Sequence, residues 1–252
     1  MKAQLALWLP YWRFWMRYHR YTVVGLEHLD GPHAKLIAGY HGRGIAWDMC
    51  MINIAIYDRL HYMPHSMLHR AIAYVPWWRW LADGLGFYIG DGPDLAAAVA
   101  RGEHIIITPG GADEGCRRWD DTYRVNWGDR LGYVKLAVKY GMSIVPVGAA
   151  GADSGYIGLN TGPALGRWLG LPRDYAYLVW TGLGPLGLYP YSPPFPVRMF
   201  QMVGAPIDPR DDGATSVRDK PALLRVHRRV TASVQALLDE ARDRMRKGQI
   251  DE

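Results

Sequence analysis

Short apolar runs and helical periodicities alternate along this chain. Apolar runs bounded by Gly, Pro, Asp or Asn predict strands at residues 23–29, 35–40, 59–63, 87–90, 104–108, 143–148, 175–181 and 197–203. Helical patterns lie between many of them, at residues 94–101, 132–140 and 223–245. This alternation favours an α/β fold: a single domain with a largely parallel central sheet and helices on both faces.

The N-terminal residues 1–22 form a separate pattern. Trp8, Trp12 and Trp15 alternate with basic residues such as Arg13 and Arg17, which predicts an amphipathic helix lying in the headgroup region of a membrane. The alternative is that the same helix packs on the domain. Basic residues follow Pro10 and no small-residue cleavage site is present, so we expect no cleaved signal peptide. The predicted division is therefore residues 1–22 as an interfacial helix and 23–252 as the main domain.

Composition adds a lipid-facing character to this picture. The chain has 252 residues, with 11 Trp and 16 Tyr against 4 Phe, a bias typical of membrane interfaces and lipid clefts or of an aromatic core. The net charge of +5 suits anionic lipid or a polyanionic ligand. Because the basic residues are scattered and form no known module, we expect no nucleic-acid partner. Residues 175–197 lack charge, but their many Pro and Gly residues predict a strand and then an apolar loop at a membrane surface rather than a spanning helix.

Cysteine usage and histidine spacing indicate no cofactor. Cys50 and Cys116 are too few for a disulfide framework and suit a reducing compartment. His61, His65 and His69 have the spacing of ligands on one helix face, but Pro64 interrupts them. We therefore expect no metal or redox cofactor. Oligomeric state has no signature in the sequence.

Two segments carry candidate chemistry at the ends of predicted strands. His41 follows strand 35–40 and offers a general base near neutral pH, with Asp48 as the acid that holds its tautomer and a helix starting near residue 45. Pro109, Gly110 and Gly111 follow strand 104–108, where backbone N–H groups can face an anion or a developing oxyanion. Both lie at the carboxyl ends of predicted strands, the usual ligand crevice. Together they predict acyl transfer onto a hydroxyl.

Two other functions stay open. A serine-dependent lipid esterase would need a nucleophile on a sharp turn, and the segment 151–155 places Ser154 one position too late for that motif. The dinucleotide-binding glycine pattern at 182–187 is followed by a proline-rich stretch instead of a helix. A non-catalytic lipid-binding protein is the remaining alternative.

Several ordered blocks resemble one family. They are His41 to Asp48, residues 85–91, residues 109–114 with the Gly-Gly-x-x-Glu pattern, residues 129–137 with Gly141, residues 144–147 and residues 203–207. In this order the chain resembles the glycerolipid acyltransferase superfamily, and most of all its diacylglycerol acyltransferase branch. The resemblance covers about residues 35–210. It departs from the family in having six residues, not four, between His41 and Asp48.

The resemblance implies a membrane-associated O-acyltransferase that moves a fatty acyl chain from acyl-CoA or acyl carrier protein directly to a glycerolipid hydroxyl. It implies His41 as base and Asp48 as its partner. We expect substrate to be bound by Arg43, Gly110, Gly111, Glu114, Arg117 and Arg130, with Arg130 meeting the phosphates of a CoA donor.

The acceptor and the location follow from the same resemblance. Phosphate-acceptor members carry Pro-Glu-Gly-Thr-Arg in this block, and the resemblance implies that its Arg holds the acceptor's phosphate. Here the acidic Asp113 and Glu114 stand in the matching region, which favours a neutral mono- or diacylglycerol. Arg117 and Arg118 nearby keep a lysophospholipid or lysophosphatidic acid acceptor as the alternative. We expect the protein to lie peripherally on the cytoplasmic face of a membrane.

Overall fold

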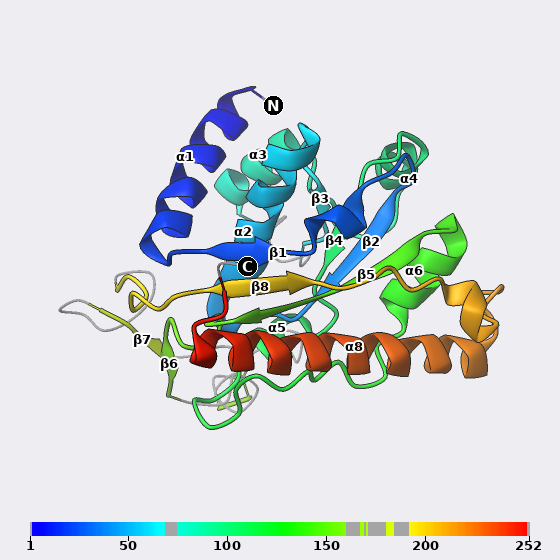
Figure 1. Cartoon of the computed structure of the whole chain (residues 1–252). Coiled ribbons are helices and arrows are strands. Elements are labelled where there is room, and N and C mark those ends of the chain that lie inside the picture. The colour runs from blue at the N-terminus through cyan, green and yellow to red at the C-terminus, as the bar shows by residue number, and fades with distance from the viewer. Residues whose placement is uncertain are drawn as a thin grey trace.

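A six-stranded sheet lies between two layers of helices in the computed structural model (Figure 1), which describes residues 2–68, 75–159, 167–168, 170, 180–183 and 192–250. The strand order is β1-β8-β5-β2-β4-β3. The bounds of these strands are Thr22–Val24 (β1), Lys35–Gly39 (β2), His65–Ser66 (β3), Ile105–Ile107 (β4), Ser143–Ala150 (β5) and Phe200–Val203 (β8). A second small sheet pairs β6 (Ile157–Gly158) with β7 (Trp180–Thr181).

The sheet is largely parallel, as the sequence predicts. Strands β5, β2, β4 and β3 run parallel to one another. Strand β8 pairs antiparallel with β5 and parallel with β1, so β1 and β8 run against the other four. The carboxyl ends of β2 and β4, which are followed by His41 and by the glycine-rich segment, therefore lie at the same edge of the parallel part.

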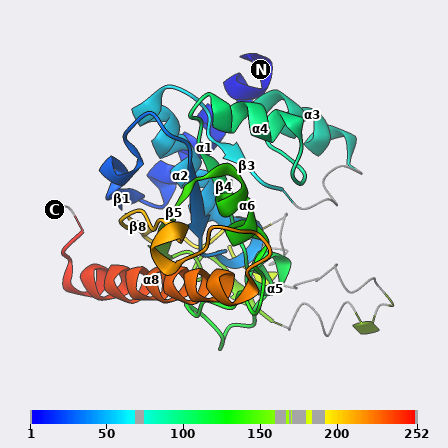
Figure 2. The same ribbon diagram turned by 90° about the vertical axis from the view of Figure 1, so that its right-hand side faces the viewer.

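Helices cover both faces of the sheet (Figure 2). On one face lies α2 (Arg43–Leu60), with α1 (Lys2–Tyr18) and α3 (Pro76–Leu85) packed outside it. On the other lie α6 (Gly132–Tyr140) and α8 (Lys220–Lys247). Remaining helical segments are α4 (Pro93–Ala100), α5 (Gly111–Gly115) and the 3₁₀ turns Leu26–Leu29 and Pro209–Asp212.

Strand β2 shows how the chain fills the two faces. Leu36, Ala38 and Tyr40 lie in the buried cluster that includes residues of α6 and α8. Ile37 lies in the opposite cluster with residues of α2 such as Ile52. Because successive side chains of a strand point to opposite faces, a strand buried on both sides reads as a continuous apolar run.

Most predicted elements are present, with boundary changes. Helix α6 begins and ends where the sequence predicts, with Gly141 (φ 64°) in the left-handed conformation at its C-terminus. Helices α4 and α8 and strands β2, β4 and β5 also match their predicted positions. The predicted strand 23–29 keeps only β1, because a 3₁₀ turn follows it. Of the predicted strand 175–181, residues 175–179 lie outside the described residues.

Two strand predictions are wrong. Residues 59–63 are not a strand, because α2 continues to Leu60 and His61 (φ 60°) caps its C-terminus by donating its N–H to the Tyr57 carbonyl. Predicted strand 87–90 is reduced to a single parallel bridge between Tyr88 and Met67. Helix α3 was not predicted between them. The apolar runs in this region therefore pack mainly as helix ends rather than as sheet.

Helix α1 packs on the domain through one face. Trp8 is nearly buried and Trp12 fully so, and Trp12 meets Trp47 of α2 edge to face with ring centroids 5.2 Å apart. Leu7, Tyr11 and Phe14 on α1 remain exposed. One face of α1 therefore packs on the domain, which was the alternative to a membrane-lying helix, and its other face is exposed to solvent. In the described part of the chain, no helix has the length and apolarity to cross a bilayer.

Candidate functional site

His41 lies at the carboxyl end of β2 and just before α2. Its Nδ1 is 2.9 Å from the Gly42 carbonyl oxygen. Because a carbonyl only accepts, Nδ1 carries the proton and Nε2 keeps its lone pair. Burial lowers the pKa of His41, so the ring is neutral at neutral pH. His41 is therefore set up to accept a proton through Nε2.

Glu114 joins the glycine-rich segment to His41. Its Oε2 accepts the His41 backbone N–H at 2.9 Å and the Trp127 indole N–H at 3.0 Å, while Oε1 accepts the Asn126 N–H at 2.9 Å. Burial raises the pKa of this carboxyl to about 7. A Cβ on Gly110 would overlap Glu114 Oε2, so only glycine leaves room for this arrangement. The two predicted segments are thus brought together, and Glu114 holds them.

Asp48 does not form the predicted hydrogen bond with His41. Its side chain is fully buried on α2, and neither carboxylate oxygen has a hydrogen-bond partner. The carboxylate lies against Gly42, where a Cβ would come within 2.7 Å of Asp48 Oδ1. Burial, with a contribution from the charge of Asp153, raises the pKa of Asp48 to about 8. The His41 Nδ1–H is therefore hydrogen-bonded to the Gly42 carbonyl and not to Asp48.

Asp153 is a central residue of the site that the sequence did not single out. Its fully buried carboxylate accepts hydrogen bonds from the Tyr40 hydroxyl (2.5 Å) and from the backbone N–H groups of Tyr123 (2.8 Å) and Arg43 (3.1 Å). It also pairs with Arg117 Nη1 at 3.0 Å. The sequence signal that could have identified Asp153 is its position shortly after β5, because β5 neighbours β2 in the sheet. Asp153 fixes the chain on either side of His41.

Arg43 and Arg117 are buried supports of this network. Arg43 is 2% exposed, and its guanidinium donates to the backbone carbonyls of four residues: Arg117, Arg118, Asp153 and Tyr156. Arg117 contacts Asp153, lies 3.5 Å from Glu114 Oε1 and stacks over the Tyr40 ring at 4.2 Å. These contacts give both arginines protein partners, and their contact with substrate stays a prediction.

The serine required by the esterase alternative is not at His41. Ser154 Oγ lies 2.7 Å from the Tyr123 hydroxyl, and the Ser154 side chain is exposed. No described serine is hydrogen-bonded to the His41 ring. The geometry thus favours a His41 that acts on a hydroxyl supplied by a substrate.

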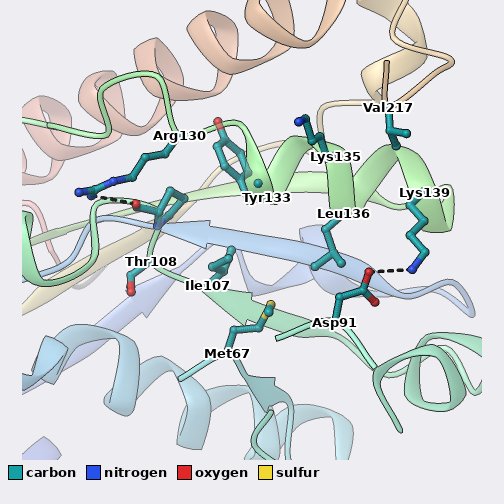
Figure 3. A pocket seen from close by; sticks show the side chains of 12 residues that line it. Met67, Asp91, Ile107, Thr108, Arg130, Tyr133, Lys135, Leu136, Lys139 and Val217 are labelled. Atoms are coloured by element: carbon teal, nitrogen blue, oxygen red, sulfur yellow. Dashed lines mark hydrogen bonds and ion pairs between the residues drawn. The ribbon is translucent and has the colours of Figure 1, made fainter. Parts of the chain in front are cut away.

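A hollow of about 510 Å³ opens beside the glycine-rich segment (Figure 3). Apolar side chains lining it are Met67, Ile107, Tyr133, Leu136 and Val217, and its cations are Arg130, Lys135 and Lys139. It begins at Thr108 and Pro109, next to the Gly110 that packs on Glu114. His41 itself does not line it.

The predicted ligand Arg130 lies at one end of this hollow. Its Nη1 donates to the Pro109 and Gly110 carbonyls, and its Nη2 pairs with Asp113. At the other end Lys139 pairs with Asp91 at 2.7 Å. Arg130 is thus near the glycine loop as predicted, but with a carboxylate partner already in place.

Comparison with known proteins gives the same family as the sequence blocks. The family model described as "Diacylglycerol acyltransferase" matches residues 8–161, more than half of the chain. The chain is 26% identical over 258 residues to the bovine (Bos taurus) "DGAT1/2-independent enzyme synthesizing storage lipids", a match that covers 98% of this chain and 71% of that protein. It is 25% identical over 236 residues to an uncharacterized protein of Mycobacterium leprae, covering 92% of this chain and 63% of that protein.

A solved structure shares the fold. The crystal structure of the 1-acyl-sn-glycerophosphate (LPA) acyltransferase PlsC from Thermotoga maritima aligns with a TM-score of 0.57 at 16% identity. The alignment covers 94% of this chain and 82% of the PlsC chain. Taken with the family match over the segment that holds His41, Gly110 and Glu114, these findings show that the chain belongs to the diacylglycerol acyltransferase family, within the glycerolipid acyltransferases.

Proposed function

We propose that this protein transfers a fatty acyl chain from an acyl thioester to the hydroxyl of a neutral glycerolipid, with His41 as general base. The observation that carries the proposal is the orientation of His41. Its backbone is held by Glu114, its Nδ1 proton is engaged by the Gly42 carbonyl, and its neutral Nε2 is left to accept a proton.

The reaction needs no covalent enzyme intermediate. His41 Nε2 takes the proton from the acceptor hydroxyl while that oxygen attacks the thioester carbonyl carbon, and a tetrahedral intermediate with an oxyanion forms. The C–S bond then breaks, and the departing sulfur takes the proton from the His41 imidazolium. The Gly111 N–H donates to the Thr108 carbonyl, so the backbone N–H of Gly110 would be the donor that stabilises the oxyanion, an effect on the order of 10² to 10³-fold for one donor in a well-studied hydrolase. The products are the ester and a free thiol.

The arginines near His41 favour a neutral acceptor. Arg43 and Arg117 are buried and already satisfied by carbonyls and by Asp153. Arg118 pairs with Asp120, and Arg130 pairs with Asp113. A phosphate-bearing acceptor would have to displace one of these partners, whereas the hydroxyl of mono- or diacylglycerol would not.

An exposed aromatic surface supports a peripheral membrane position. We use "aromatic surface" for Leu7, Tyr11 and Phe14 of α1 and Trp77, Trp78 and Trp80 of α3, all at least 39% exposed. The two helices are in contact, and Gln4 Nε2 of α1 donates to the Trp80 carbonyl at 3.4 Å. Exposed Trp and Tyr side chains suit the interface between headgroups and acyl chains. Two cysteines in 252 residues are too few for a disulfide framework, which suits the cytoplasmic face.

The catalytic proposal is tested with His41→Ala and, as a matched control, His33→Ala, which changes an exposed histidine outside the site. Both variants are assayed with acyl-CoA or acylated carrier protein on monoacylglycerol, diacylglycerol and lysophosphatidic acid. We expect product on the neutral acceptors and a loss in His41→Ala on the order of 10² to 10⁴-fold. A folded His41→Ala protein with full activity would refute the assignment of the base. Acylation of lysophosphatidic acid alone would refute the neutral acceptor.

The membrane proposal is tested by liposome flotation. Replacing Trp77, Trp78 and Trp80 together by Ser should reduce partition into vesicles containing anionic lipid, because these side chains supply much of the exposed apolar area. Trp119→Ser, at a 60% exposed tryptophan outside the aromatic surface, is the control and should leave partition unchanged. Equal partition of the two variants would exclude the aromatic surface as the contact.

A further inference from the structure

One loop presents two of the groups that hold Glu114 in place. We call residues 123–130, which lie between α5 and α6 and are neither helix nor strand, the 123–130 loop. Its Asn126 N–H and Trp127 indole N–H are two of the three N–H groups that the Glu114 carboxylate accepts. The third is the backbone N–H of His41. A displacement of the loop is therefore transmitted through Glu114 to the backbone of His41.

Helix α8 holds this loop at two points. Gln235 Oε1 accepts the Val125 N–H at 3.0 Å, and Gln235 Nε2 donates to the Tyr123 carbonyl at 3.1 Å. His227 Nε2 lies 2.8 Å from the Gly128 carbonyl oxygen. Eight residues of helix separate His227 from Gln235, which is about 12 Å along the axis. Because the loop has no regular hydrogen-bond ladder of its own, these contacts with α8 set its position.

His227 also joins the loop to α6. Because the Gly128 carbonyl only accepts, Nε2 of His227 carries the proton, and Nδ1 accepts the Tyr133 hydroxyl at 3.1 Å. The Tyr133 hydroxyl points from α6 toward α8 (Figure 3). Burial lowers the pKa of His227, so the ring is neutral and keeps this tautomer at neutral pH. Both ring nitrogens of His227 are thus used to hold neighbouring segments.

The Trp127 indole packs against the rings of Tyr133 and His227. All three side chains are buried. The Trp127 ring meets Tyr133 edge to face with centroids 5.4 Å apart, and its centroid is 6.4 Å from that of His227. The indole N–H lies in the plane of its ring, so the orientation that this packing gives to Trp127 decides whether the N–H reaches Glu114.

We propose that His227 is a positioning residue for the acyl transfer: it orients Trp127 and the 123–130 loop so that Glu114 holds His41 in place to accept the proton. The inference rests on the proposed function. His227 itself touches neither His41 nor Glu114. It acts through two contacts in series, first on the Gly128 backbone and the Tyr133 hydroxyl, and then through Trp127 on the Glu114 carboxylate.

A purely structural role for His227 makes a different prediction. If His227 only filled the core, its replacement would lower stability as any truncation in that core does, with no particular effect on Glu114. Val230 provides the comparison, because it is fully buried on α8 in the same cluster and its side chain forms no hydrogen bond. Val230→Ala therefore disturbs the packing of α8 and leaves the contacts of His227 in place.

The test uses four variants of the full chain, each checked for folding by circular dichroism. His227→Phe removes both hydrogen bonds and keeps a ring, His227→Gln keeps a donor for the Gly128 carbonyl, and Tyr133→Phe removes only the hydroxyl. Val230→Ala is the control. The first readout is the indole N–H signal of Trp127 in ¹⁵N–¹H spectra, assigned by its loss in Trp127→Phe. The second is kcat with palmitoyl-CoA on the acceptor that the wild type prefers.

We expect the Trp127 N–H signal to move upfield in His227→Phe, because a proton in a weaker hydrogen bond is more shielded. The kcat of this variant should fall by about tenfold to 10²-fold, since a displacement of about 1 Å can cost on the order of 10²-fold. Tyr133→Phe should change both readouts in the same direction by less, and His227→Gln should restore most of kcat. Val230→Ala should lower the melting temperature and leave the Trp127 signal and kcat unchanged.

Two results would overturn the inference. One is an unchanged Trp127 signal in His227→Phe, or in Tyr133→Phe if His227→Phe does not fold. The other is a fall in kcat that is as large in Val230→Ala as in His227→Phe. The two readouts also separate this inference from the proposed function. A shifted Trp127 signal in a protein that acylates no acceptor would support the link from His227 to Glu114 and refute the reaction, whereas normal turnover with an unchanged signal would refute only the role of His227.

Discussion

The stability of an Asp48→Asn variant relative to the wild type should increase with pH. The carboxyl is fully buried without a hydrogen-bond partner, and its pKa rises from an ordinary 3.8 to about 8. Folding at neutral pH therefore requires Asp48 to take up a proton that the unfolded chain does not hold. The stability that the protonated form provides is complete below about pH 4 and is lost as the pH rises through about 8.

The size of the effect follows from this shift. Each pH unit in this window costs the folded state about 1.4 kcal/mol, so the advantage of Asp48→Asn over the wild type should grow by about 3 kcal/mol between pH 5 and pH 7. Any titration of Glu114 occurs in both proteins and cancels in the difference. The assay is urea unfolding of both proteins at unit steps of pH between 5 and 8.

The control is a substitution of an exposed carboxylate. Asp83→Asn removes an exposed carboxylate of α3 and should stay within about 0.5 kcal/mol of the wild type at each pH. If the stability difference between Asp48→Asn and the wild type does not vary with pH, the buried, unpartnered state of Asp48 is refuted. Activity measured on the same samples shows whether the reaction depends on this carboxyl.

Three further substitutions test the supports of the site. Gly110→Ala should displace Glu114, because the added Cβ overlaps its carboxylate, and should lower the stability by about 1 to 3 kcal/mol with loss of activity. Gly92→Ala, where a Cβ meets nothing within 4 Å, is the control. Equal melting temperatures of the two variants would contradict this packing. Arg43→Lys should cost about 3 kcal/mol in urea unfolding, because buried carbonyls lose their donors; a stable variant with a raised KM for acceptor would instead restore the predicted role in substrate binding. Trp12→Ala should cost about 3 to 5 kcal/mol, and a negligible loss would show that α1 is not part of the packed domain.

The local sequence was sufficient to predict the elements that hold the candidate site. Strand β2 and strand β4 are apolar runs that end in His41 and in the Pro109–Gly111 segment, and both were placed by pattern alone. Helix α6 was predicted to the residue because Gly141 provides the left-handed conformation at its end. Helix α3, which begins at Pro76, was missed because Trp77, Trp78 and Trp80 lie on its exposed side, so that apolar residues alone do not mark its buried face.

By itself the sequence determined the strand and helix alternation, the largely parallel sheet and the neighbouring positions of His41 and the glycine-rich loop, because periodicity and turn residues are local properties. The tertiary structure alone decided the roles of the charged residues. Asp153 meets Arg43 across 110 positions of sequence, Arg43 and Arg117 turn inward, and Asp48 lies against Gly42 instead of beside the His41 ring. Such roles depend on which side chains the folded chain buries together, and burial and pairing are set by contacts between distant segments that no local pattern records.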